Sequence, residues 1–106
     1  MNASTVDVLY IDGCPNVDAA GEHARLALAA TGVSADLKLV RVDSEADAMR
    51  LRFLGSPTVR VNGQDVEPSA QGRQDFGLRC RIYEVNGRLV GAPPVSWIEA
   101  ALRGGR

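Results

Sequence analysis

The spacing of apolar residues changes several times along this chain, and each change marks a predicted element. Residues 5–11 form a short apolar run rich in β-branched side chains, which predicts a buried central strand. Residues 15–31 carry apolar side chains at helical spacing and stop at Gly32, so they predict a helix. Residues 35–42 alternate apolar and polar positions, which predicts a half-buried strand near the edge of a sheet.

The middle of the chain predicts a second helix and a third strand. Ser44 resembles a helix-capping residue, and the helix it introduces is expected over residues 45–54. Residues 58–61 are rich in valine and predict a strand. Asn62-Gly63 follows this strand directly and predicts a tight turn, because both residues accept the backbone angles that such a turn needs.

The last third of the chain predicts a loop, one more strand and a closing helix. Residues 68–77 are polar and contain glycine, which is typical of a loop. Residues 78–85 alternate and predict the last strand, followed by a turn at Asn86-Gly87. A helix is expected to open at residues 92–94. In the last strand the alternation assigns one face to the apolar core, formed by Leu78, Cys80 and Ile82. The other face is assigned to the surface and carries Arg79, Arg81 and Tyr83.

The order of predicted elements is therefore βαβαββα. The first βαβ unit gives two parallel strands with a right-handed crossover, and the last two strands can pair antiparallel. We expect an α/β fold with a mixed four-stranded sheet and helices on both of its faces. At 106 residues the chain predicts a single domain, residues 1–106.

Composition and charge narrow the classes of function. A formal net charge of −1 gives no electrostatic reason to expect nucleic acid or an anionic membrane as a partner. The sequence has no long apolar run and no signal-peptide pattern at its start, so the expected compartment is the cytoplasm. Two cysteines and one histidine without metal-binding spacing predict no metal site. We expect a monomer or a weak dimer.

Cys14 is the candidate nucleophile. It follows the first predicted strand within Gly13-Cys14-Pro15, and Pro15 fits the first position of a helix. A cysteine at the start of a helix meets unpaired N–H groups and the positive end of the helix dipole, which favour the reactive thiolate. The alternative is a cysteine that only packs in a turn.

Three motifs in register resemble the thioredoxin superfamily. They are the strand before Gly13-Cys14-Pro15 and its helix, the Gly55-Ser56-Pro57-Thr58 stretch before the third strand, and the ββα ending. The resemblance implies a thioredoxin-like fold in which Pro57 is cis and packs against Cys14. It also implies that Gly13, Pro15, Ser56, Pro57 and Thr58 border the substrate site. Backbone groups of Ser56 and Thr58 could then hold an extended substrate as an added strand.

The sequence departs from that superfamily at the second cysteine of its Cys-x-x-Cys motif. The quartet here is Cys14-Pro15-Asn16-Val17, so valine stands where the resolving cysteine would be. The chain therefore looks more like small bacterial thioredoxin-like proteins with a Gly-Cys-Pro motif. A mixed disulfide on Cys14 would need Cys80 or glutathione to resolve it. For Cys80, the alternative is a buried small hydrophobe.

The sequence predicts a thiol–disulfide oxidoreductase that uses Cys14, acting as a monothiol enzyme or resolved by Cys80. No cofactor is expected beyond glutathione as a co-substrate, and the partner would be a thiol or disulfide, small or on a protein. Two alternatives stay open. One is an organomercurial-lyase-like or mercury-binding protein that uses both cysteines, since thiolates bind soft metals. The other is a non-catalytic module with the same fold.

Overall fold

The computed structural model describes residues 4–104; residues 1–3 and 105–106, the two ends of the predicted domain, lie outside the described part. Strands and helices alternate in the first half, and short strands dominate the second. In chain order the elements are β1 (Ser4–Tyr10), α1 (Val17–Thr31), β2 (Ala35–Arg41), α2 (Glu45–Leu51), β3 (Thr58–Val61), β4 (Gln64–Asp65), a 3-10 turn (Pro68–Ala70), β5 (Tyr83–Val85), β6 (Arg88–Val90) and α3 (Val95–Leu102).

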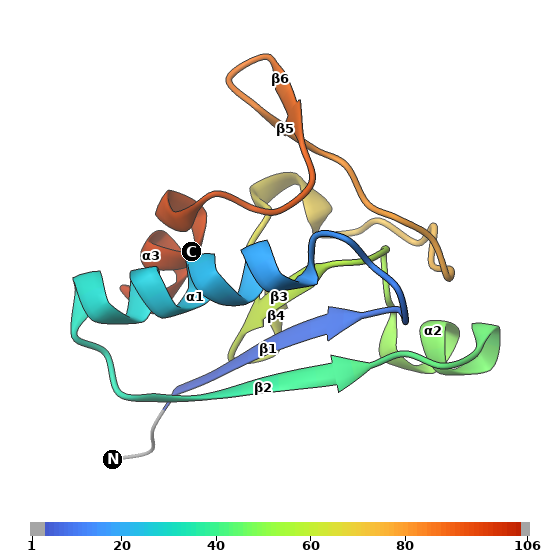
Figure 1. Cartoon of the computed structure of the whole chain (residues 1–106), viewed down its shortest axis with the longest axis horizontal. Helices are drawn as coiled ribbons and strands as arrows, with labels where there is room; N and C mark the ends of the chain where they lie inside the picture. The colour runs from blue at the N-terminus through green and yellow to red at the C-terminus, as the bar shows by residue number, and fades with distance from the viewer. Residues whose placement is uncertain (1–3, 105–106) are drawn as a thin grey trace.

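Four strands form one mixed sheet in the order β2-β1-β3-β4 (Figure 1). β1 pairs parallel with β2, which α1 makes possible because parallel neighbours need a crossover connection. β3 pairs antiparallel with β1, so that Val8 lies opposite Val59. β4 returns antiparallel along β3 after a turn at Asn62 and Gly63, both of which have positive φ, as a hairpin turn of this length prefers.

Helices cover both faces of this sheet. α1 and α3 lie together on one face, where their buried side chains meet Val6, Val8 and Val59 (Figure 1). α2 lies against the other face, where Ala48 joins a cluster with Leu9. Val8 and Leu9 are neighbours in one strand, and successive side chains point to opposite faces. The predicted α/β class, with a mixed four-stranded sheet and helices on both faces, is confirmed.

The prediction of a last strand over residues 78–85 is wrong for residues 78–82, and only Tyr83–Val85 is a strand. Residues 78–82 are not part of any strand, and the fourth strand of the sheet is the short β4. β5 and β6 form a separate two-stranded hairpin that stands away from the sheet (Figure 1), an addition that the order βαβαββα lacks. The hairpin turn at Asn86-Gly87 was placed correctly, since both residues have positive φ. The second helix ends at Leu51, three residues earlier than predicted, because Arg52 adopts the left-handed conformation.

Residues 77–81 run beside residues 53–56 and are joined to them by backbone hydrogen bonds. Gly77 N donates to Phe53 O at 3.0 Å, and Ser56 N donates to the carbonyl oxygen of Arg79 at 2.8 Å. Along this pairing the chain passes from the α2 side of the sheet to the β5–β6 hairpin. It also places residues 79–81 directly beside the loop that precedes β3.

Candidate functional site

Cys14 lies at the end of a tight turn that follows β1. Its backbone N–H donates to the carbonyl oxygen of Ile11 at 3.2 Å, and Gly13 has a φ of 78°, which glycine adopts without strain. Asp12, Gly13 and Pro15 are exposed, whereas Cys14 keeps only 9% of its surface. The turn therefore presents its flanking residues to solvent and holds the thiol residue largely inside.

The predicted place of Pro15 in the helix is wrong. α1 begins at Val17 with Asn16 as its N-cap, whose carbonyl accepts the first helical hydrogen bond, from Ala20 N at 3.1 Å. Tertiary packing accounts for the later start, since the Asn16 side chain lies against Gly91, where any Cβ would come within 2.3 Å of it. Cys14 thus lies two residues before the N-cap. The effect of the helix dipole falls off within the first turn, so it acts on Cys14 less than the sequence pattern suggests.

The Ser56–Pro57 peptide bond is cis, as predicted. Pro57 is buried and precedes β3 directly. The hydroxyl oxygen of Ser56 accepts a hydrogen bond from Ile11 N at 3.1 Å. Because Ile11 also accepts the hydrogen bond from Cys14, Ile11 connects the Cys14 turn to the cis-proline loop.

Thr58, like Ser56 and Pro57, is buried and does not border an open pocket, contrary to the prediction. Its surface is fully buried, and its hydroxyl donates to the carbonyl oxygen of Gly55 at 2.6 Å. The same hydroxyl accepts a hydrogen bond from Arg81 at 2.9 Å. The buried hydroxyl of Thr58 thus stabilises the loop that precedes β3.

Cys80 lies on the other side of Ser56. The two residues form an isolated parallel bridge, in which Ser56 N donates to Arg79 O at 2.8 Å and Arg81 N donates to Ser56 O at 2.9 Å. Cys80 is exposed, and so is Ile82 at 62%, so the prediction that their face is the apolar core is wrong. Both cysteines are free thiols. Ser56 is thus the residue around which the structure brings the Cys14 turn and the Cys80 segment together.

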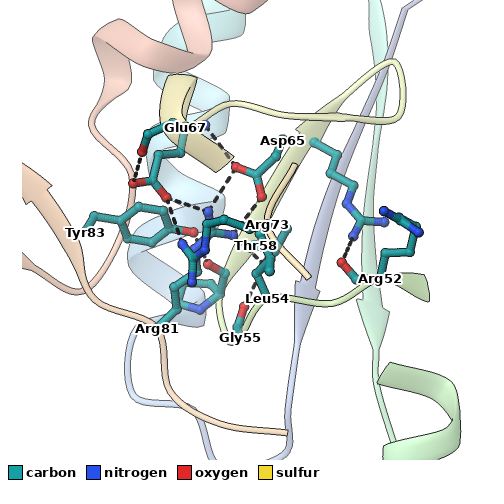
Figure 2. A network of polar contacts seen from close by, with 12 residues as sticks. Arg52, Leu54, Gly55, Thr58, Asp65, Glu67, Arg73, Arg81 and Tyr83 are labelled. Carbon is teal, nitrogen blue, oxygen red and sulfur yellow. Dashed lines mark hydrogen bonds and ion pairs between the residues drawn. The ribbon is translucent and has the colours of Figure 1, made fainter. Parts of the chain in front are cut away.

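A buried charged network beside this loop was not predicted from the sequence (Figure 2). The side chain of Arg81 is 2% exposed and donates to Asp65 Oδ2 at 2.7 Å, to Asp65 Oδ1 at 3.1 Å and to Glu67 Oε1 at 2.7 Å. Burial acts to lower the pKa of Arg81, but these carboxylates outweigh it and raise the pKa above its ordinary value. The guanidinium also lies 4.5 Å from the centre of the Tyr83 ring.

Tyr83 completes the network on the far side of the guanidinium. It is fully buried, and its hydroxyl donates to the carbonyl oxygen of Pro57. Burial raises the pKa of Tyr83. One signal for the network was present in the sequence. Asp65 and Glu67 flank the buried Val66, so their alternation places two carboxylates on one side of an extended chain, where they favour a nearby arginine.

A cavity of about 420 Å³ lies on the α2 side of the molecule, away from both cysteines. Arg52 and Arg60 line it, and neither has a carboxylate within ion-pair distance among the residues the structure describes. Arg60 instead donates to the carbonyl oxygens of Leu51 and Arg52, at 2.7 and 3.0 Å, and burial lowers its pKa. None of the residues predicted for the site lines this cavity.

The part of the chain from Ser4 to Gly104 contains no cluster of three or more histidine, cysteine or acidic side chains that could hold a metal ion. Within the same residues, no helix is both long and apolar enough to cross a membrane. No family model, curated protein or solved structure matches this chain.

Proposed function

We propose that this chain has a thioredoxin-like fold and acts as a thiol–disulfide oxidoreductase with Cys14 as its nucleophile. The observation that carries the proposal is the connection of the Cys14 turn to the loop directly before β3 through Ile11, which accepts from Cys14 N and donates to the Ser56 hydroxyl. In the thioredoxin superfamily, which the sequence motifs resemble, a cis-proline loop faces the reactive cysteine. Here the two segments are joined in space although Pro57 lies 43 positions after Cys14 in the sequence.

The topology of the sheet also supports the proposal. A central β1 with a parallel neighbour β2 and an antiparallel neighbour β3 leaves the Cys14 turn and the start of β3 at the same end of the sheet. α1 and α3 share one face and α2 lies on the other. This arrangement agrees with the thioredoxin-like fold that the motifs imply.

The chemistry follows from one thiolate. The Cys14 thiolate attacks one sulfur of a disulfide, a new S–S bond forms, and the other sulfur leaves as a thiolate. A second thiolate then attacks the mixed disulfide. Glutathione attacks the substrate sulfur and releases the Cys14 thiolate, whereas Cys80 attacks the Cys14 sulfur, releases the substrate half as a thiolate and leaves a Cys14–Cys80 disulfide that glutathione reduces. Val17 cannot supply that second thiolate, so we assign it to glutathione or to the exposed Cys80. In this proposal the protein works in the cytoplasm as a monomer or weak dimer.

The test compares the wild type with Cys14→Ser and Cys80→Ser. With glutathione as reductant and bis(2-hydroxyethyl) disulfide as substrate, Cys14→Ser should lower the protein-catalysed rate by about 100-fold or more, because in this proposal the Cys14 thiolate makes the first attack on the disulfide. Cys80→Ser is the matched control, and a small effect would assign resolution to glutathione. An unchanged rate for Cys14→Ser would refute the proposal.

A non-catalytic, anion-binding module is the second candidate function. The observation that favours it is the cavity of about 420 Å³, which neither cysteine lines and in which Arg52 and Arg60 have no carboxylate partner among the described residues. Asp65 and Glu67 also line this cavity, but their carboxylates pair with Arg81. Binding of a small carboxylate there, measured by calorimetry and lost in Arg60→Gln, would favour this candidate if Cys14→Ser has no effect. Organomercurial cleavage stays a prediction, tested by release of Hg(II) from an organomercurial by the reduced protein.

A further inference from the structure

We infer that the Cys14 site takes disulfides of low molecular weight and excludes extended protein strands, because the chain's own residues 79–81 fill the strand position beside Ser56. This inference rests on the proposed function and narrows its substrate class. It replaces the expectation that Ser56 and Thr58 hold a substrate strand.

The backbone of Ser56 has no free hydrogen-bonding group for a partner. Its N–H donates to Arg79 O at 2.8 Å, and its carbonyl oxygen accepts from Arg81 N at 2.9 Å. A peptide that binds as an added strand needs such groups to be unpaired. A protein substrate would therefore have to displace residues 79–81 first.

The segment that fills this position is held along its length. Arg79 donates from its guanidinium to the carbonyl oxygen of Leu54 at 3.3 Å, in addition to the backbone bonds. Gly55 allows the close approach, because a Cβ there would lie 2.9 Å from the Cβ of Arg81. The contact between the two segments is therefore too close for any residue but glycine at position 55.

The buried Arg81 side chain opposes displacement further. Moving residues 79–81 away from Ser56 would withdraw the guanidinium from Asp65, Glu67 and Thr58. It would leave the two carboxylates, which are 15% and 13% exposed, without this cation. Separating a buried ion pair leaves uncompensated charge, which is strongly unfavourable.

A small disulfide avoids this cost. It needs access to the Cys14 sulfur and no pairing with the backbone of Ser56. The 9% exposure of Cys14 also favours a small reagent over a folded protein surface. In the resulting exchange, one thiolate leaves the small disulfide, and a low-molecular-weight thiol then releases the second half and regenerates Cys14.

The first experiment compares two substrates for the wild-type protein, with glutathione as reductant. The substrates are bis(2-hydroxyethyl) disulfide and the disulfides of insulin, and the rate with Cys14→Ser is subtracted from each. We expect a kcat/KM for insulin that is lower by about 100-fold or more. Equal or faster reaction with insulin would overturn the inference while leaving the proposed function intact. Loss of the Cys14 dependence with both substrates would instead overturn the proposed function, and the inference with it.

The second experiment loosens the segment. Arg81→Lys keeps the charge but loses the planar, forked geometry that binds two carboxylates, and Arg88→Lys, on the exposed hairpin, is the matched control. We expect Arg81→Lys to raise the ratio of the insulin rate to the small-disulfide rate, and Arg88→Lys to leave it unchanged. If Arg81→Lys does not fold, Asp65→Asn carries the same expectation. An unchanged ratio in the folded variant would overturn the inference.

Discussion

Two regions of this molecule follow the same alternating pattern with opposite results. In β1, the apolar residues Val6 and Val8 are fully buried, as the pattern predicts. In residues 80–83, the charged Arg81 and the polar-tipped Tyr83 are buried, whereas Cys80 and Ile82 are exposed. The alternation is correct in both regions, but only in the first does hydrophobicity decide which side faces inward.

The difference comes from what each region meets. β1 has an apolar cluster on each face, one that includes α1 and α3 and a smaller one around Phe53, so apolar side chains are favoured at its buried positions. Residues 80–83 cross over two carboxylates, Asp65 and Glu67, and the carbonyl oxygen of Pro57. Donors are needed there, and Arg81 and Tyr83 supply them. A buried face is therefore apolar only where the residues that it packs against are also apolar.

The largest expected effect is on the charged region. Arg81→Met should lower the free energy of unfolding by about 3–5 kcal/mol, because it leaves Asp65 and Glu67 without their buried cation. Arg88→Met on the exposed hairpin is the control and should change it by less than about 0.5 kcal/mol. Urea unfolding measures both, and a loss of under about 1 kcal/mol for Arg81→Met would contradict the comparison.

The next effect tests the contrast between a buried and an exposed isoleucine. Ile98→Ala removes a fully buried side chain from the cluster beneath α1 and α3 and should cost about 2–5 kcal/mol. Ile82→Ala, at 62% exposure, should cost less than about 0.5 kcal/mol. Similar costs in thermal unfolding would mean that Ile82 is covered in solution.

A smaller effect tests the hydroxyl of Tyr83. Tyr83→Phe removes its hydrogen bond to Pro57 O and should cost about 0.5–1.5 kcal/mol near neutral pH. Because burial raises the pKa of Tyr83 in the folded state, its contribution is complete below the unfolded value near 10 and is lost as the pH rises above it. Between about pH 8 and 11, the free energy of unfolding should fall with rising pH for the wild type and fall less steeply for Tyr83→Phe. Parallel curves would contradict this assignment.

The smallest effect concerns Asp75, an exposed residue shortly before residues 77–81. A hydrogen bond from Arg73 lowers the pKa of Asp75 to about 2. Its contribution is present above the ordinary value and is lost as the pH falls toward the lowered one. Asp75→Asn should therefore flatten the acid side of the stability profile slightly, as followed by circular dichroism. A steeper acid side in this variant would be the opposite of the expected result.

Much of the first half of the fold could be predicted from the sequence. Helical spacing placed α1 within two residues, and alternation placed β2 at the edge of the sheet, because local pattern and burial agree there. The cis bond at Pro57 was also predicted. The start of α1 was missed because the contact between Asn16 and Gly91 joins distant segments, and no local pattern reports such a contact.

The sequence motifs indicated which segments meet, and less of how they are arranged. The Cys14 turn and the loop before β3 are connected through Ile11, whereas Ser56, Pro57 and Thr58 are all buried and line no open pocket. The place of Cys80 beside Ser56 depends on the Arg81 network, whose members come from separate stretches of the chain. The periodicity of a sequence does not reveal such a network, because it indicates on which face of an element a side chain lies and not which residue that side chain contacts.

The β5–β6 hairpin has a practical consequence. Its turn residues, Asn86 and Gly87, are exposed, and within the described residues the hairpin strands are not paired with any strand of the four-stranded sheet. A peptide tag or a fluorescent group introduced between them should leave the sheet and both cysteines untouched. The molecule thus carries an internal labelling position, useful for surface immobilisation or single-molecule work without modifying either terminus.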